Sequence, residues 1–242
     1  MRRVVRGFWG PRQEPAEALA ERWQATLDRF TGFLPDAGAA GSDGTRWTWR
    51  TVPASGPAET LQPPDEASLL GALRTAQAAD DWSAGNGTSL RLLADTAPGW
   101  KVEVAGLAGG SPQFLLQSLV ATIVSPDDAQ VPDAELLTAL AEVWAPDHGE
   151  VSDRAVTSAL KKEAGFRIGT PSVGWVAYLS PSRAIRIPPA LAPHSRPLPD
   201  DKGVLLTLAP PGDVAAVVTA YRSLEEAGAL EPLPQPMTRP TL

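Results

Sequence analysis

Two histidines, His148 and His194, are the side chains of this chain best suited to acid–base or metal chemistry. Each lies in a stretch rich in Pro, Gly or acidic residues. Neither has a motif partner at the close spacing that zinc sites show. Cys is absent, which excludes thiolate metal sites, Cys nucleophiles and disulfides. The sequence therefore predicts no catalytic residue, no metal site and no cofactor.

Other signatures of catalysis or nucleotide binding are missing. The chain has no G-x-S-x-G elbow, no G-x-G-x-x-G after a strand and no P-loop. The Gly-rich stretch 106–112 precedes a predicted strand rather than a helix, which indicates a turn and not a phosphate cradle. Asp80 and Asp81 are adjacent at a helix end, where acids are usually solvated. Carboxylates brought together by the fold remain an open route to hydrolase chemistry.

Helices are predicted where apolar residues recur every three to four positions. Asp65 stands where an N-cap would begin the second of them. The predicted helices span residues 15–34, 65–79, 132–144, 153–163 and 213–227.

Strands are predicted where apolar and polar residues alternate or where a short apolar run is bounded by turn residues. In one of them Lys101 and Glu103 alternate with apolar neighbours, which is typical of a sheet with one face in water. The predicted strands span residues 3–9, 46–50, 89–94, 100–105, 114–124, 172–179 and 203–209.

Helices and strands are mixed along the chain without regular alternation, and three strands follow one another between residues 89 and 124. This order predicts an α+β fold, with a largely antiparallel sheet or sheets and helices packed on one face. Residues 36–44 and 181–199 are predicted loops, and 231–242 is a Pro-rich, irregular tail. One domain over residues 1–242 is expected, with two related subdomains, about 1–125 and 126–230, as the alternative.

Net charge and apolar patterning limit the classes of partner. The formal charge of −7 argues against a broad basic face for nucleic acid and favours a basic protein partner. Trp47 and Trp49 would point to one face of their strand, which indicates core rather than a base-stacking platform. No signal peptide and no apolar run long enough to span a bilayer is visible, so a cytoplasmic location without a membrane partner is expected.

Acidic residues gather in a stretch without any Lys or Arg, between Val102 and Asp153. Asp133 and Glu135 suit the positive end of the helix that begins there. The others are either a solvated face or a negative patch for a basic partner. The residues predicted to form this patch are Asp127, Asp128, Glu135, Glu142, Asp147 and Glu150.

Four segments resemble the immunity protein 52 family of bacterial polymorphic toxin systems. They are the opening Arg6-Gly7-Phe8-Trp9-Gly10-Pro11-Arg12 with Glu14; Trp144-Ala145-Pro146-Asp147 with Val151-Ser152; the stretch 173–180, similar to a Gly-Trp-x-x-Tyr-Leu-Ser strand; and Gly228-Ala229-Leu230. The motif residues predicted to be structural are Arg6, Gly7, Trp9, Gly10, Arg12, Trp144, Gly174, Trp175 and Tyr178.

The resemblance implies an α+β protein without enzymatic activity, encoded beside a toxin that often carries a restriction-endonuclease-like nuclease domain. Such a protein neutralises the toxin by binding, and the acidic patch would then cover the active cleft of a basic nuclease domain. The resemblance does not identify the toxin or the oligomeric state. Two other readings stay open: a hydrolase with carboxylates assembled by the fold, and an adaptor of a secretion locus that uses exposed Trp or a polyproline segment at 232–236.

Overall fold

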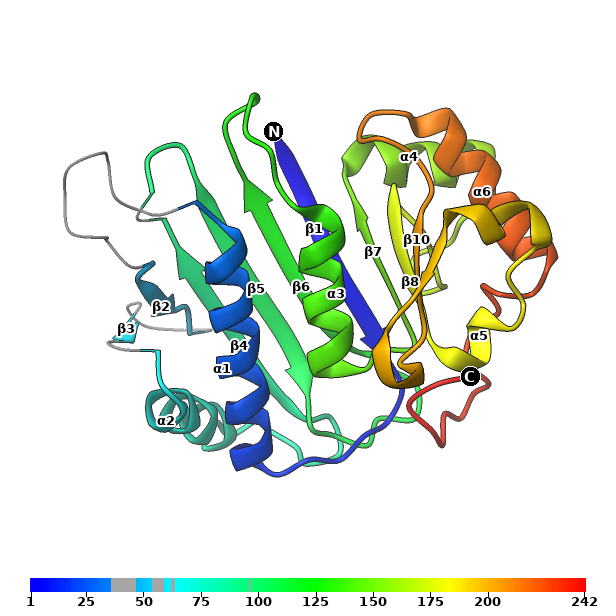
Figure 1. Ribbon diagram of the computed structural model, residues 1–242. Helices are drawn as coiled ribbons and strands as arrows, with labels where there is room; N and C mark the ends of the chain where they lie inside the picture. The colour runs from blue at the N-terminus through cyan, green and yellow to red at the C-terminus, as the bar shows by residue number, and fades with distance from the viewer. Residues whose placement is uncertain (36–46, 54–58, 62–63, 96) are drawn as a thin grey trace.

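A computed structural model describes residues 1–35, 47–53, 59–61, 64–95 and 97–242. The predicted loop 36–44, the predicted strand residue Arg46 and much of the connection 53–64 lie outside the described residues. The strands form one ten-stranded sheet in the order β3-β2-β4-β5-β6-β1-β7-β8-β10-β9, and each neighbouring pair is antiparallel (Figure 1). The α+β class with an antiparallel sheet is therefore confirmed.

The strands, with their bounds, are β1 Arg2–Trp9, β2 Trp49–Thr51, β3 Glu59–Leu61, β4 Thr88–Ala94, β5 Lys101–Ala108, β6 Gln117–Val124, β7 His148–Ser152, β8 Val176–Leu179, β9 Ser195–Pro197 and β10 Val204–Thr207. The helices are α1 Ala16–Phe33, α2 Glu66–Gln77, α3 Asp133–Trp144, α4 Arg154–Glu163, α5 Pro181–Ala184 and α6 Val214–Glu226, with short 3-10 helices at Pro189–His194 and Pro199–Asp201.

The N-terminal strand β1 lies in the middle of the sheet. It pairs with β6 on one side, where Arg6 lies opposite Val120, and with β7 on the other, where Arg6 lies opposite Glu150. Strands from both halves of the chain therefore share one hydrogen-bonded sheet. The alternative division into two related subdomains stays a prediction.

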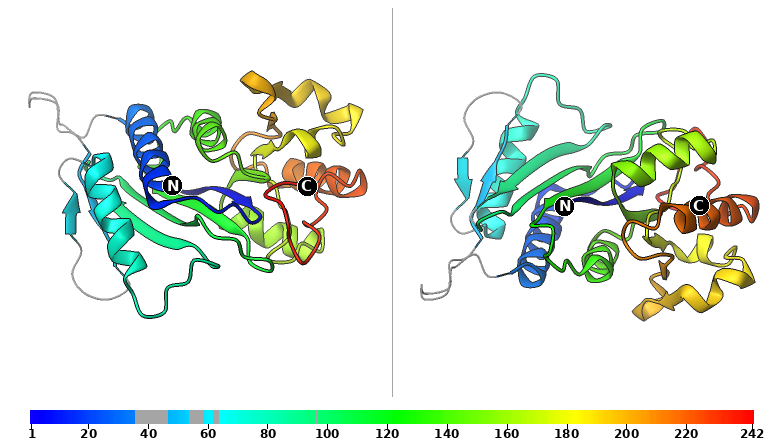
Figure 2. Two further views of the ribbon diagram at one scale, coloured as in Figure 1. Left: turned by 90° about the horizontal axis from the view of Figure 1, so that it is seen from below. Right: turned by 90° about the horizontal axis from the view of Figure 1, so that it is seen from above.

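Helices cover the two ends of the sheet differently (Figures 1 and 2). Helices α1 and α3 lie over one face, where α1 also packs against α2. Helix α4 lies on the opposite face, behind β7 and β8, with α6 beside it. As a result, every residue of β7 and β8 is buried, whereas β1, β4, β5 and β6 alternate between buried and partly exposed positions.

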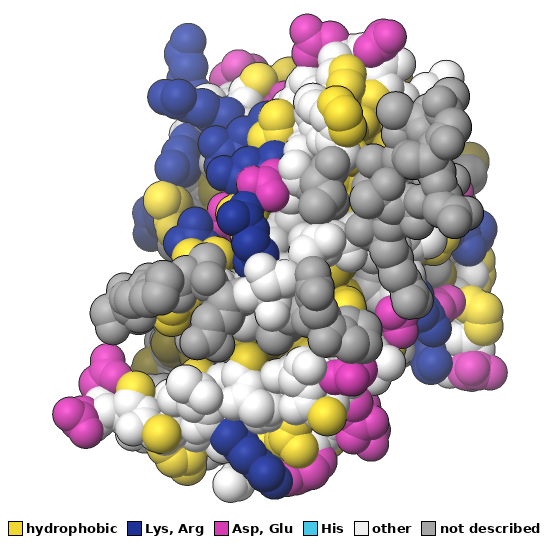
Figure 3. All heavy atoms as spheres, turned by 90° about the vertical axis from the view of Figure 1, so that its left-hand side faces the viewer, with side chains coloured by type: hydrophobic (Ala, Val, Ile, Leu, Met, Phe, Trp, Pro, Cys, Tyr) yellow, Lys and Arg dark blue, Asp and Glu magenta, His cyan; other side chains and the backbone are white. Residues whose placement is uncertain are grey.

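The outward-facing side of β4, β5, β6 and β1 carries no helix, and we call it the open face (Figure 2). The pairing register places Arg2, Val124 and Lys101 in one row across it, and Arg6, Val120 and Ala105 in another. Figure 3 looks onto the left-hand side of Figure 1, and Lys and Arg side chains gather at the upper left of that view. Although the chain has a formal net charge of −7, its cations are therefore unevenly distributed over the surface.

Local sequence signals explain most helix boundaries. The Asp65 side chain accepts a hydrogen bond from the Ser68 amide at 2.9 Å, which confirms the predicted N-cap. Asp153 caps α4 and Asp213 caps α6 through the amides three residues on, at 2.9 and 3.1 Å. Trp47 and Trp49 are both buried, as their alternation predicted.

Two strand predictions were wrong. The stretch His148–Ser152 is absent from the predicted strands, yet it forms β7, because its polar residues find buried partners on neighbouring elements. Gly106 was placed in a turn, yet β5 continues through Ala108. A Cβ on Gly106 would lie 2.9 Å from the Trp23 ring, so the missing side chain permits α1 to pack closely on this strand. The Pro-rich stretch 181–199 contains α5, the 3-10 helix Pro189–His194 and the short strand β9 as well as loop.

The C-terminal tail has no regular secondary structure, as predicted, but it packs against the domain. The Gly10 amide donates to the Pro240 carbonyl at 2.9 Å, and the Met237 amide donates to the Gln113 carbonyl at 2.8 Å. Leu233 and Met237 are buried. The tail therefore closes the end of the sheet where β1 finishes.

Candidate functional site

The tryptophans of the family motifs are core residues. Trp9 at the end of β1 stacks on Trp144 at the end of α3, with ring centroids 5.5 Å apart and planes at 24°. The Trp23 ring meets Trp144 edge-on at 5.7 Å, and the Trp144 Nε1 donates to Thr26 Oγ1 at 2.7 Å. These rings fasten α1 and α3 to the centre of the sheet.

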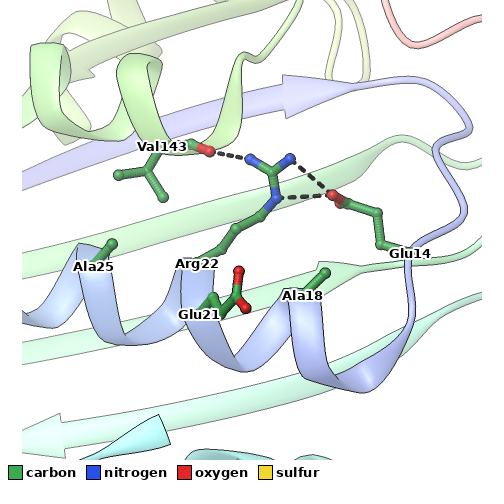
Figure 4. A pocket seen from close by; sticks show the side chains of 6 residues that line it. All are labelled: Glu14, Ala18, Glu21, Arg22, Ala25 and Val143. Carbon is green, nitrogen blue, oxygen red and sulfur yellow. Dashed lines mark hydrogen bonds and ion pairs between the residues drawn. The ribbon is translucent and has the colours of Figure 1, made fainter.

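Arg12 and Arg22 lie at the C-terminal end of α3 and donate hydrogen bonds to backbone carbonyls there. Helix α3 has no basic residue in its own last turn. Arg22 donates to the Val143 carbonyl and to Glu14, as Figure 4 shows. Arg12 donates to Glu14 at 3.2 Å, and its guanidinium lies 5.0 Å from the Trp9 ring centroid. Burial lowers the pKa of Arg12 from its ordinary value. Cations at this helix end offset the negative end of the helix dipole, which is a structural role.

The groove between α1 and α3 is therefore occupied by an ion-pair network. Its lining residues are Glu14, Ala18, Glu21, Arg22, Ala25 and Val143 (Figure 4). Glu14 accepts from both arginines, so its carboxylate is engaged within the fold.

Two motif glycines are required by close approach. A Cβ on Gly174 would lie 1.7 Å from the Val151 carbonyl oxygen, which is incompatible with the backbone there. A Cβ on Gly7 would lie 2.5 Å from Leu140 Cδ2, where α3 crosses β1. Both positions bring elements into contact and expose no side chain for recognition.

The remaining motif residues also hold elements together. The Trp175 Nε1 donates to Asp133 Oδ2 at 2.8 Å, and Arg3 Nη1 lies 2.9 and 3.0 Å from the two oxygens of the same carboxylate. The Tyr178 hydroxyl donates to the Lys202 carbonyl at 2.6 Å, and burial raises the pKa of Tyr178. Asp133 therefore binds two buried side chains, Arg3 and Trp175, in addition to standing at the first residue of α3.

Asp147 forms the most buried ion pair of the described residues. Its Oδ2 accepts from Arg183 Nε at 2.9 Å and from Nη2 at 2.5 Å, and both side chains are 0% exposed. Its Oδ1 accepts from the Leu242 amide at 2.9 Å, which ties the chain end to β7. Asp147 was predicted to lie on a partner-binding patch. That prediction was wrong, because α5 supplies a cation from 36 residues further along the chain.

Glu150 is also excluded from an accessible patch. It is 1% exposed and accepts from Arg6 Nε at 2.5 Å and from Ser152 Oγ at 3.3 Å. The stretch without Lys or Arg suggested free acids, but β1 lies beside β7 and brings Arg6 to this carboxylate.

The buried cluster shifts two pKa values. Burial alone would raise the pKa of Asp147, but hydrogen bonds from His148 and Arg183 outweigh it and lower this pKa to about 2. Burial lowers the pKa of His148 below its ordinary value, despite the neighbouring Asp147 carboxylate. His148 also stacks on Phe8, with ring centroids 5.4 Å apart. The cluster favours charged Asp147 and neutral His148.

Asp147 and His148 line a small cavity beneath the tail, together with Arg183, Leu233 and Met237. Both Asp147 oxygens already accept hydrogen bonds from the fold. Within the described part of the chain, no group of three or more His, Cys, Asp or Glu residues is arranged to hold a metal ion.

Four of the six predicted patch residues remain at the surface. Asp127 is 98% exposed and pairs with the N-terminal amine at 2.7 Å, whereas Asp128 and Glu135 are exposed. Glu142 is partly exposed and pairs with Arg29 across the α1–α3 boundary. Their role in binding a partner stays a prediction.

The open face was missed by sequence reasoning. The alternation around Lys101 indicated a wet face, but only the strand register shows that cations from β1, β4 and β5 share it and that Arg50 of the neighbouring β2 borders it. The cations are Arg2, Arg6, Arg50, Arg91 and Lys101.

The motif residues therefore hold the fold together, and their buried charged groups are paired inside it. The model of the family Immunity protein 52 matches residues 4–233, and the chain belongs to this family. The family is that of immunity proteins directed against a toxin. No curated protein matches the chain. Over the described residues, no helix combines the length and apolar character needed to cross a membrane.

Proposed function

We propose that this protein neutralises a nuclease-type toxin by binding to it and covering its active site, without catalysing a reaction itself. The family match over residues 4–233 is the observation that carries the proposal. The internal use of the motif residues supports it, because binding requires an exposed surface rather than a perturbed catalytic group.

The two other readings have less support. A hydrolase needs a carboxylate that is free to act on substrate, and Asp147 is saturated by Arg183 and the Leu242 amide. An adaptor that uses the segment 232–236 has exposed Pro232, Pro234 and Pro236 to offer, but Leu233 and Met237 anchor that segment to the domain.

The direct test uses the product of the neighbouring gene, which the proposal takes to be the toxin. Purified toxin would be titrated with the protein while its nuclease activity is measured, and complex formation would be followed by calorimetry at low salt. We expect inhibition to be complete at one binding equivalent and to weaken as the concentration of nucleic-acid substrate rises. A complex that leaves the nuclease fully active would refute coverage of the active site, and no complex at low salt would refute the whole proposal.

A separate experiment tests whether the four surface acidic residues of the predicted patch bind the toxin. Asp128→Lys combined with Glu135→Lys reverses charge beside and on α3. Glu163→Lys combined with Glu226→Lys makes the same change in net charge on α4 and α6. If the acidic patch meets a basic toxin, only the first pair weakens binding, and the loss shrinks as salt is added.

A further inference from the structure

The open face carries partly exposed apolar side chains among its polar ones. Antiparallel sheets that face water usually carry polar side chains on that side. Here nearly half of the outward positions of the four strands are apolar and only partly buried: Val4, Phe8, Leu93, Ala105, Leu107, Val120 and Val124. An exposed apolar area of this kind on a soluble domain marks a contact surface.

Cations border this apolar centre at one end and on the side toward β2. Arg2 and Lys101 lie in the row at one end, both exposed, and neither has an ion-pair partner among the described residues. Arg91 and Arg50 lie toward the side of the sheet, where Glu103 and Asp95 pair with them. Arg6 is neutralised by buried Glu150. The two exposed carboxylates do not balance the cations, so the rim carries net positive charge.

The rigid backbone favours binding at this face. Its side chains project from strands that are hydrogen-bonded on both sides, so their spacing is set before a partner arrives. A preorganised surface loses less conformational entropy on association than a loop does. An apolar centre with a charged rim is also the usual anatomy of a specific protein interface.

We propose that the toxin docks on the open face, and that the toxin surface seated there has an apolar centre bordered by carboxylates. The charge complementarity between this rim and such a partner supplies the orientation. This inference rests on the proposed function, since it names the surface that binds the toxin.

The first test compares two double charge reversals. Arg2→Glu with Lys101→Glu alters the rim of the open face. Arg29→Glu with Arg74→Glu makes the same change in net charge on α1 and α2, and all four residues are exposed. Affinity for a catalytically inactivated toxin domain would be measured by calorimetry, with thermal melting to verify the fold. We expect the open-face variant to bind at least about tenfold more weakly, and the helix-side variant to bind like the native protein.

Equal affinity of the native protein and the open-face variant would overturn the inference and leave the proposed function intact. Failure of the native protein to bind the toxin would overturn both. A fluorescent DNA duplex is the third probe. Binding of this duplex to the open face with toxin binding unaffected would assign the surface to nucleic acid and overturn the inference.

A second measurement does not depend on charge. Because the chain has no Cys, Thr122→Cys places a single thiol within the open face, and Ala25→Cys places one in the groove of Figure 4. We expect toxin to slow alkylation of the thiol at 122 severalfold and to leave the thiol at 25 unaffected. Protection of 25 without protection of 122 would place the toxin on the helices instead.

Discussion

The two ends of this sheet differ in whether their ion pairs are buried or exposed. Around β7 and β8, helices cover both faces, every strand residue is buried, and Asp147 pairs with Arg183 at 0% exposure. Along β4, β5, β6 and β1, one face is open, and Arg91 pairs with Glu103 at 51% and 29% exposure. The same pair of chemical groups thus joins elements at one end and lies at the surface at the other.

The difference teaches which charged residues are available to a partner. A buried charge is tolerated only when it is paired and hydrogen-bonded, so each buried ion of β7 is committed to the fold. An exposed pair contributes little to stability, so its members can exchange one partner for another. The following predictions test this contrast, beginning with the largest effect.

Removing Arg183 should produce the largest loss of stability. Arg183→Met keeps much of the side-chain volume but leaves the Asp147 carboxylate buried without its cation. We expect the free energy of unfolding to fall by about 3–5 kcal/mol, measured by urea denaturation. Asp147→Asn combined with Arg183→Met should recover part of this loss. If stability does not recover, the loss comes from altered packing and not from the unpaired charge.

Deleting the tail should have the next largest effect. A chain that ends at residue 231 loses buried Leu233 and Met237 and the hydrogen bonds to Gly10 and Asp147. Apolar burial offset by the entropy of the released tail predicts a loss of roughly 2–4 kcal/mol. Toxin affinity, measured below the melting temperature, should be unchanged if the tail is structural. Loss of affinity with stability intact would instead favour the adaptor reading.

Acid should destabilise the protein in two stages. The pKa of His148 lies below its ordinary 6.5, so the unfolded chain takes up the proton first and stability begins to fall as pH drops through about 6.5. The pKa of Asp147 is lowered from 3.8 to about 2, so a further loss of about 2 kcal/mol falls between pH 4 and pH 2.

Denaturation midpoints across pH would measure both stages. His148→Gln should remove the first stage and retain the second. A native stability that stays constant from pH 7 to pH 5 would contradict the neutral state of His148.

The Arg91–Glu103 pair should show the smallest effect. Because both groups are partly exposed, we expect a double-mutant cycle with Arg91→Ala and Glu103→Ala to give a coupling energy below about 1 kcal/mol. Coupling should fall further in high salt. A coupling energy as large as that of the buried Asp147–Arg183 pair would contradict the contrast between the two ends of the sheet.

Sequence reasoning located the helices well because their signals are local. Asp65 caps the residues beside it, and the stripe of α3 needs only its own twelve residues to be visible. It missed β7, whose His, Gly and Glu residues show no alternation and depend on strands more distant in the chain. The predicted patch failed at Asp147 and Glu150 for the same reason, since their cations come from α5 and β1.

The sequence by itself determined the α+β class, the five longer helices with the Asp65 cap, the buried Trp47 and Trp49, and the family to which the chain belongs. These follow from short-range periodicity and from motif residues that hold the fold. Only the tertiary structure decided which acids are buried and that cations from three strands share an open face. The physical reason is that burial and charge pairing depend on strand register and helix placement, which join residues far apart in the chain.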